Sequence, residues 1–244
     1  MRTARFFCET IEQNSDVFLS DVQMRHLTKV LRLAKGDTVE LFDGKGTVAE
    51  AIIEKTSKDK TRLKIKSLNI SESRKNRRII IASSTAKSQR FELIIAKCTE
   101  LGIDRITPVI FDRTVKQLQG KNALRRYELL AIESAKQCGR NFMPVIDEPK
   151  NFLNAVEEMP KLYPDAKIIF GSLTNGSESI INLNTGKQDI IAFIGPEGGL
   201  TDSEEIALKK INAIPVRLTD TILRIETASI AAASILAAKR DSKE

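Results

Sequence analysis

The sequence IAFIGPEGG, at residues 191–199, decides the fold of this chain. It is an apolar segment that runs directly into a glycine-rich turn. A second apolar segment, PVRL at residues 215–218, runs into TDTILRIETA at residues 219–228. A strand, a glycine-rich loop and a helix in succession form a common ligand-binding crevice in α/β proteins. Two such units close together predict one small-molecule site built from both loops.

Length and composition set the class of protein. The chain has 244 residues, of which 41% are hydrophobic, so it can bury a core in each of two domains. No apolar run reaches the roughly 20 residues that a membrane-spanning helix needs, and charges interrupt the N-terminal segment before it could act as a signal peptide. Three cysteines and one histidine fit neither a disulfide framework nor a His-rich metal site. We therefore expect a cytoplasmic protein without a metal and with reduced thiols.

The net charge of +7 is concentrated in the middle of the chain. Residues 73–145 hold 15 Lys and Arg against 6 Asp and Glu, whereas residues 146–244 hold 11 against 15. A localised basic excess favours a polyanionic partner such as RNA. A plain solvated surface is the alternative, because most single surface charges contribute little.

The chain divides near residue 72. Before it, segments of alternating polarity cover residues 38–42, 47–55 and 61–69, and the first two are joined by a hairpin turn. A helix is expected over residues 21–31, with Ser20 and Gln23 as a capping box. This predicts a small β-rich barrel with one helix in residues 1–72. A polar, basic linker follows at residues 71–78.

Residues 73–244 alternate between apolar runs and helical patterns. Expected strands cover residues 79–83, 106–111, 145–146, 167–170, 190–194 and 216–218, and expected helices cover residues 89–101, 123–137 and 226–238. Such alternation is typical of an α/β domain with a mainly parallel sheet. A further capping box, Thr201 with Glu204, starts another helix directly after the glycine-rich turn.

The glycine-rich turn favours a neutral or cationic ligand. Gly198 and Gly199 permit close approach of a ligand to the backbone. Neither phosphate-binding glycine pattern, GxxxxGK[ST] or GxGxxG, occurs in the chain, and Glu197 would repel a phosphate. A plain strand-to-helix turn is the alternative. Arg224 and Glu226 stand in an otherwise apolar segment, where charges are usually partnered and often functional. They could instead form a surface pair at a helix start.

Five short runs together resemble one family. The two loops GPEGG (195–199) and LRIETA (223–228) are similar to the signature of the RsmE family, the N3-uridine methyltransferases of small-subunit ribosomal RNA within the SPOUT superfamily. Three more runs fit in order: His26 with VLR (30–32), ELG (100–102) and QCGRN (137–141). The resemblance covers essentially the whole chain. It differs at Thr219 and Thr221, where glycine and a basic residue are more usual.

The resemblance implies a fold and a cofactor. Residues 1–72 would form a PUA-like β-barrel that binds RNA, and residues 73–244 a SPOUT methyltransferase domain whose parallel sheet carries a C-terminal trefoil knot. The protein would be a homodimer that binds S-adenosyl-L-methionine in the knot. The cofactor-binding residues it implies are Gly171, Leu173, Ile194, Gly195, Pro196, Glu197, Gly198, Gly199, Leu218, Ile222, Leu223 and Arg224.

The implied reaction is methylation of N3 of a specific uridine in 16S rRNA of the small ribosomal subunit. The uracil must lose its N3 proton, so a cation is needed to stabilise the resulting anion, and Arg224 or Arg140 could supply it. Glu226 or Glu133 could be the base. Expected RNA-binding residues are Arg2, Arg5, His26, Arg32, Arg77, Arg78 and Asn141.

Two other functions stay open from the sequence. A non-catalytic RNA-binding factor for ribosome assembly would keep the basic segment and the barrel, but it would not need both glycine-bearing turns with Arg224 and Glu226. A related SPOUT enzyme could methylate a ribose or a guanine instead. The full-length resemblance favours the uridine enzyme.

Overall fold

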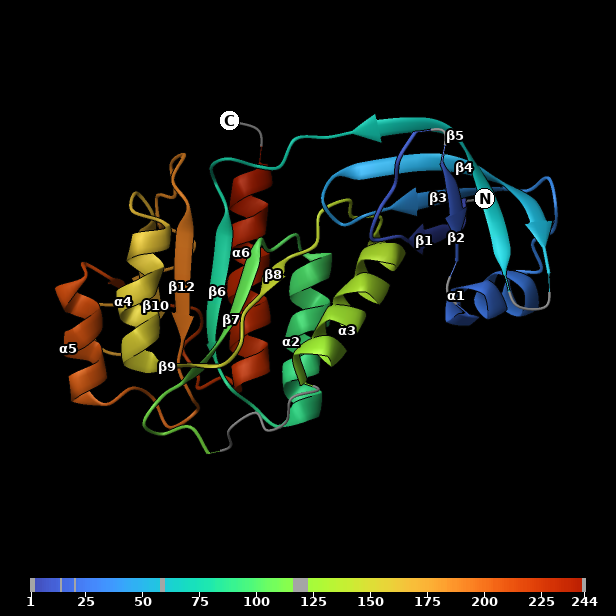
Figure 1. The fold of residues 1–244 in the computed structure, drawn as a ribbon. Coiled ribbons are helices and arrows are strands. Elements are labelled where there is room, and N and C mark those ends of the chain that lie inside the picture. The colour runs from blue at the N-terminus through green and yellow to red at the C-terminus, as the bar shows by residue number, and fades with distance from the viewer. Residues whose placement is uncertain (1–2, 14, 20, 58–59, 116–122, 243–244) are drawn as a thin grey trace. The chain divides into compact units, whose positions relative to one another are not determined.

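The computed structural model describes residues 3–13, 15–19, 21–57, 60–115 and 123–242. Arg2 and Ser20, both candidates from the sequence, lie outside these residues. The chain forms two compact units, whose helices and strands are labelled in Figure 1. The first unit comprises Met1–Ser73 with Ala135–Met143, and the second comprises Arg74–Ser134 with Pro144–Glu244.

The first unit is a five-stranded sheet with a short helical segment. Its strands are β1 (Arg5–Phe7), β2 (Asp16–Phe18), β3 (Thr38–Phe42), β4 (Thr47–Thr56) and β5 (Thr61–Ile70). They lie in the order β1-β3-β4-β5-β2, with β1 parallel to β3 and the other pairs antiparallel. The three strands expected from alternating polarity are therefore confirmed. Alternate residues of these strands, such as Leu41, Ile53 and Leu63, are fully buried in the core of this unit.

The turn between β3 and β4 requires glycine. Gly46 has a φ of +108°, and a Cβ there would lie 2.5 Å from the carbonyl oxygen of Ser71 and 2.6 Å from the Phe142 ring. Close packing by Phe142 is what brings the segment Ala135–Met143 into this unit. A side chain at position 46 would therefore displace that segment.

The helix expected over residues 21–31 is only partly α-helical. α1 (Asp21–Arg25) continues as a π-helix, η1 (His26–Val30), in which the Leu31 amide donates to the His26 carbonyl at 3.0 Å. The wider turn places Leu27 in the core and leaves Val30 and Leu31 exposed. Arg32 follows with a φ of +55°, which is unusual for a residue other than glycine.

The second unit is an α/β domain. Its strands are β6 (Ile79–Ser84), β7 (Arg105–Ile110), β8 (Val145–Ile146), β9 (Lys150–Asn151), β10 (Lys167–Gly171), β11 (Glu178–Ser179), β12 (Ile190–Ile194) and β13 (Ile214–Arg217). They lie in the order β11-β13-β10-β12-β6-β7-β8, with β9 beside β7, and neighbouring strands in the described part of the chain pair in parallel. The parallel sheet expected from the sequence is confirmed.

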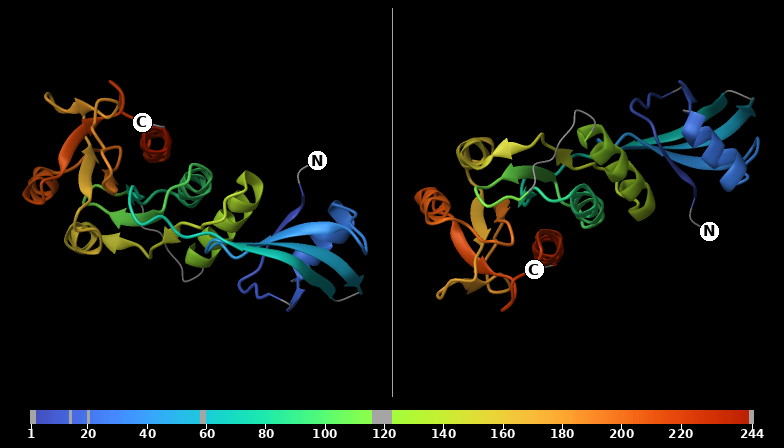
Figure 2. Two further views of the ribbon diagram at one scale, coloured as in Figure 1. Left: turned by 90° about the horizontal axis from the view of Figure 1, so that it is seen from above. Right: turned by 90° about the horizontal axis from the view of Figure 1, so that it is seen from below.

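Helices cover both faces of this sheet. They are α2 (Ser88–Glu100), α3 (Ala123–Cys138), α4 (Phe152–Leu162), α5 (Asp202–Lys210) and α6 (Ile225–Asp241). Figure 2 shows α2 and α6 side by side on one face and α4 and α5 on the other. β6 serves both faces, because Ile80 and Ala82 belong to the apolar core with α4, whereas the Ser83 hydroxyl lies 2.9 Å from that of Ser229 in α6. The α2, α3 and α6 helices agree with expectation, while α4 was not expected.

Candidate functional site

The carboxyl ends of β10, β12 and β13 meet at one edge of the parallel sheet. The loops that follow them enclose a cavity of about 440 Å³. This size falls within the range of small-molecule sites. The lining residues are Gly171, Ser172, Leu173, Thr174, Ile194, Gly195, Pro196, Glu197, Gly198, Gly199, Leu200, Glu205, Val216, Leu218, Thr219, Thr221, Ile222, Leu223 and Ala228. The structure thus brings together the two glycine-bearing turns and the segment after β10.

The glycine-rich loop is held from both sides. Arg113 donates from Nη1 to the carbonyl oxygens of Gly198 at 2.8 Å and Leu200 at 3.2 Å. A Cβ at Gly195 would lie 2.8 Å from Leu200 Cδ2, so the end of the Leu200 side chain would have to shift to admit it. The Arg113 contacts therefore fix the path of the loop beside the cavity. The close approach of a ligand to the backbone at Gly198 and Gly199 stays a prediction.

The capping box at the start of α5 is confirmed. The Glu204 amide donates to the Thr201 hydroxyl, and the Thr201 amide donates to Glu204 Oε2 at 2.8 Å. Glu204 Oε1 also accepts from the Asp112 amide at 2.9 Å. One buried carboxylate therefore joins the helix start to the segment that carries Arg113, and this fixes the far end of the loop.

The second loop presents an apolar wall. Ile222 is 72% exposed and Leu223 half-buried, and both line the cavity. The loop is shaped by a hydrogen bond from the Thr219 hydroxyl to the Thr221 carbonyl at 3.0 Å. These threonines, where the chain differs from the resembled family, are thus part of the cavity. An apolar ligand surface placed against Ile222 would remove it from water, which is a favourable process.

Arg90, in the first turn of α2, connects the glycine-rich loop to the first turn of α6. Its Nη1 lies 3.3 Å from Glu197 Oε1, and its Nε lies 3.6 Å from Glu226 Oε1. Glu197 belongs to the glycine-rich loop and Glu226 to the first turn of α6. Sequence reasoning missed Arg90, because nothing in its local pattern distinguishes it from other helical arginines. The sequence predicted that Glu226, a charge in an apolar segment, has a partner, and Arg90 is that partner.

The remaining candidates around the reaction lie elsewhere. Arg224 is exposed as the N-cap residue of α6 and does not line the cavity. Arg140 belongs to the first unit, and Glu133 lies in the α3 portion of the second unit. Glu226 and Arg224 both adjoin lining residues, because Arg224 directly follows Leu223 and its carbonyl accepts from the Ala228 amide at 2.8 Å.

Two of the expected RNA-binding residues contact each other within the first unit. Arg5 lies over the Phe42 ring at 4.2 Å, forms an ion pair with Glu40 at 2.8 Å and donates a hydrogen bond to the Asn141 side chain. Arg5 is buried, so its contacts hold the segment around Asn141 against the sheet. By contrast, His26 and Arg32 are exposed, at the π-helix and just after it.

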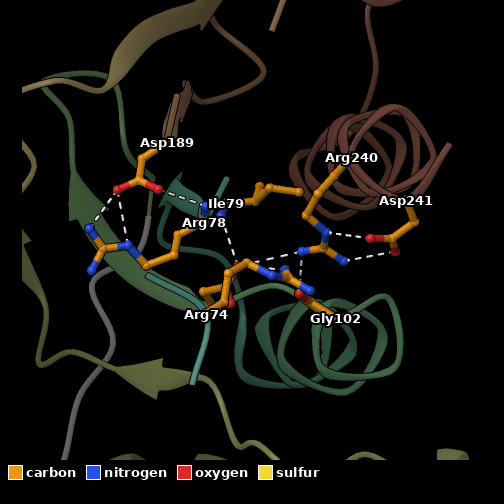
Figure 3. Close-up of polar contacts among 8 residues, drawn as sticks. Arg74, Arg78, Ile79, Gly102, Asp189, Arg240 and Asp241 are labelled. Atoms are coloured by element: carbon orange, nitrogen blue, oxygen red, sulfur yellow. Dashed lines mark hydrogen bonds and ion pairs between the residues drawn. The ribbon is translucent and has the colours of Figure 1, made fainter. Parts of the chain in front are cut away.

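The basic segment before β6 is anchored to the amino-terminal edge of the parallel sheet. The Arg78 amide, Nε and Nη2 donate to the Asp189 carboxylate at 2.7, 2.9 and 2.5 Å (Figure 3). Arg74 and Arg240 both approach Asp104, at 3.6 and 3.4 Å, and Arg240 donates to the Gly102 carbonyl. Since the cavity lies at the carboxyl ends of the strands, this network stands at the opposite edge.

Burial raises the pKa of two cysteine thiols. It raises the pKa of Cys8 to about 11 and that of Cys98 to about 12, so both are protonated at neutral pH. Within the described ranges, no cluster of three or more His, Cys, Asp or Glu could hold a metal ion. No helix in the described part of the chain is long and apolar enough to cross a membrane.

Comparisons with known proteins cover most of the chain. A family model described as an RNA methyltransferase domain matches residues 73–237, and one described as an RNA methyltransferase PUA domain matches residues 19–66. The ribosomal RNA small subunit methyltransferase E of Buchnera aphidicola is 29% identical over 231 residues, which span 93% of this chain and 90% of that protein.

Two solved structures are similar over nearly their full length. A methyltransferase from Legionella pneumophila in complex with the bound cofactor SAM has a TM-score of 0.87 and 27% identity, covering 98% of both chains. A ribosomal RNA small subunit methyltransferase E from Neisseria gonorrhoeae bound to S-adenosyl methionine has a TM-score of 0.81 and 27% identity, covering 96% of both.

Proposed function

Because the chain belongs to the RNA methyltransferase family that includes ribosomal RNA small subunit methyltransferase E, we propose that it methylates N3 of a specific uridine in 16S rRNA with S-adenosyl-L-methionine. The observation that carries this proposal is the cavity at the carboxyl ends of β10, β12 and β13. Relatives solved with S-adenosylmethionine bound share this fold over their whole length.

The cavity residues suit that cofactor. S-adenosylmethionine supplies a methyl group on a cationic sulfonium. Glu197 lines the cavity and offers a carboxylate to a cation, and Ile222 and Leu223 offer apolar walls to a flat ring. Gly195 and Gly198 line the cavity, and their peptide groups would hydrogen-bond the polar edges of the adenine. We assign all the cofactor residues expected from the sequence to this cavity except Arg224, which does not line it.

We also assign roles to the two parts of the chain. Residues 1–72 are the PUA-like RNA-binding domain, with the exposed His26 and Arg32 as phosphate or base contacts, and residues 73–244 are the methyltransferase domain. The C-terminal trefoil knot, the homodimer and the cytoplasmic location implied by the resemblance are part of the same proposal. Methyl transfer itself depends mainly on positioning the base and the methyl group in line.

Two measurements test the proposal. Isothermal titration calorimetry with S-adenosylmethionine should show saturable binding that Ile222→Ala weakens by about tenfold, since burial of an Ile side chain contributes roughly 1.5–3 kcal/mol. Ile206→Ala is the matched control, because Ile206 is also exposed but does not line the cavity. Absence of binding by the folded wild type would favour the non-catalytic assembly factor.

The second measurement identifies the product. Unmodified small ribosomal subunits are incubated with the protein and the cofactor, and the rRNA is digested to nucleosides for mass spectrometry. N3-methyluridine is the expected product. A 2′-O-methylated nucleoside or a methylguanosine in its place would assign the protein to another branch of these enzymes.

A further inference from the structure

We propose that Arg90 is the cation that stabilises the negative charge on the target uracil during methyl transfer. The inference rests on the function proposed above and goes beyond it by replacing Arg224 and Arg140, the two arginines that the sequence suggests for this role. None of these three arginines lines the cavity, but the Arg90 guanidinium lies 3.3 Å from Glu197, a carboxylate that does line it.

The place of Arg90 in its helix is electrostatically unfavourable. It is the third residue of α2, whose first turn contains no acidic residue. A cation near a helix N-terminus is repelled by the helix dipole, typically by about 0.3–1 kcal/mol. Glu197 and Glu226 offset that repulsion from two other segments of the chain. An arginine held in this position by two distant carboxylates indicates a role at the site rather than in the helix.

The two carboxylates leave part of the guanidinium group free. The contacts to Glu197 and Glu226 use Nη1 and Nε, and Nη2 makes no hydrogen bond to any described residue. The Arg90 side chain is 37% exposed. Since a guanidinium presents five N–H donors in one plane, the remaining donors can meet a planar acceptor such as a uracil oxygen.

Glu226 is placed to hold Arg90 rather than to receive the substrate proton. Its side chain is 11% exposed, and its Oε2 is buried without a hydrogen-bond partner among the described residues. An incoming base cannot reach a buried oxygen, so the contact of Oε1 with Arg90 is what remains for it to do. We therefore assign Glu226 as a positioning residue for the guanidinium.

The methyl transfer breaks the N3–H bond of the uracil and the S–C bond of the methyl donor, and it forms one N–C bond. The uracil N3–H proton passes to solvent, and the negative charge spreads over the two ring oxygens, where Arg90 stabilises it. The N3 lone pair forms the new N–C bond to the methyl carbon as the S–C bond breaks, and that electron pair stays on sulfur. A preorganised cation at developing negative charge contributes about 10²- to 10³-fold in rate.

The test uses Arg90→Met, Arg90→Lys and, as a matched control on the same helix, the exposed Lys97→Met. Cofactor affinity is measured by calorimetry and folding by circular dichroism. Methylation rates are measured on target RNA that carries either uridine or 5-fluorouridine at the modified position. Fluorine makes the N3 proton more acidic, so less stabilisation of the anion is needed.

Arg90→Met should bind the cofactor within about threefold of wild type but methylate uridine RNA about 100-fold more slowly, and Arg90→Lys should recover part of the rate. On 5-fluorouridine RNA, the loss of methylation rate in Arg90→Met should be at least about tenfold smaller than on uridine RNA. If Arg90→Met loses the same factor in methylation rate on uridine RNA and on 5-fluorouridine RNA, the assignment is overturned. If Arg90→Met is unfolded, Arg90→Lys takes its place in this comparison. If the wild-type protein binds the cofactor but methylates no uridine, the proposed function itself is overturned.

Discussion

The ion pair between Arg78 and Asp189 should be worth far more than a surface pair of the same geometry. Arg78→Met removes the hydrogen bonds from Nε and Nη2 to the carboxylate but keeps the one from the backbone amide. It also removes the guanidinium from the Tyr163 ring, which lies 4.7 Å from it. The Asp189 side chain is 10% exposed, so water cannot fully replace what is lost.

The magnitude follows from burial. Hydrogen bonds to charged groups contribute about 1.5–3 kcal/mol each, so two of them set an upper range of about 3–6 kcal/mol. The Arg78 side chain is 36% exposed, and screening by solvent lowers that figure. We expect Arg78→Met to lower the free energy of unfolding by about 2–3 kcal/mol.

Arg62→Met is the matched control. Arg62 Nη2 lies 2.7 Å from Asp16 Oδ2, but the two side chains are 47% and 40% exposed. Exposed pairs contribute less than about 1 kcal/mol. Both variants are unfolded in urea and followed by far-ultraviolet circular dichroism, because the chain contains no tryptophan. If the two substitutions cost the same, the burial of Asp189 does not decide the strength of its pair.

The loss of unfolding free energy caused by Arg78→Met should not depend on pH across the neutral range. The hydrogen bond to Asp189 raises the pKa of Arg78 above its ordinary value. A group with a raised pKa contributes stability that is present below its unfolded pKa and is lost as the pH rises through the folded value. For arginine both values lie far above the neutral range, so the effect of Arg78→Met should be equal at about pH 6 and pH 9.

Two further predictions concern packing and the thiols. Gly195→Ala should lower the free energy of unfolding by about 1 kcal/mol, because its new methyl group would lie 2.8 Å from the end of a leucine side chain, which has to shift. Gly171→Ala is the control, since its nearest contact is 3.9 Å, and equal urea midpoints for the two variants would contradict the clash. At about pH 8 a thiol reagent should label the half-buried Cys138 first, because burial raises the pKa of Cys8 and Cys98. The contribution of the Cys8 and Cys98 thiols to the free energy of unfolding should be complete below about pH 8.5 and be lost as the pH rises toward 11–12. Urea titrations at rising pH would detect this loss.

Local pattern was enough to predict the helices and strands around the cavity. Thr201 and Glu204 stand three residues apart, and that spacing alone specifies the reciprocal hydrogen bonds that start α5. The apolar run before Gly195 is fully buried as β12, because both faces of a parallel sheet are covered by helices. The family resemblance drawn from five short runs is confirmed by the comparisons.

Local pattern failed where backbone geometry depends on packing. The segment after Arg25 continues as a π-helix, and a helical period in the sequence does not distinguish this turn from an α-helical one. α4 was missed although four of its residues, Phe152, Ala155, Val156 and Met159, are buried against the sheet. Its spacing is helical, but Pro160 and short flanking strands obscure it in the sequence.

The sequence by itself determined most of the helices and strands around the cavity, the glycines of the loops and the family of the chain, because these depend on neighbouring residues. Only the tertiary structure decided which charges meet. Arg90 and Glu197 are 107 residues apart in the chain, yet their side chains lie 3.3 Å apart once β6 and β12 pair. Likewise Arg78 pairs with Asp189, 111 residues away. Contacts of this range depend on how the sheet is ordered, and no local spacing carries that information.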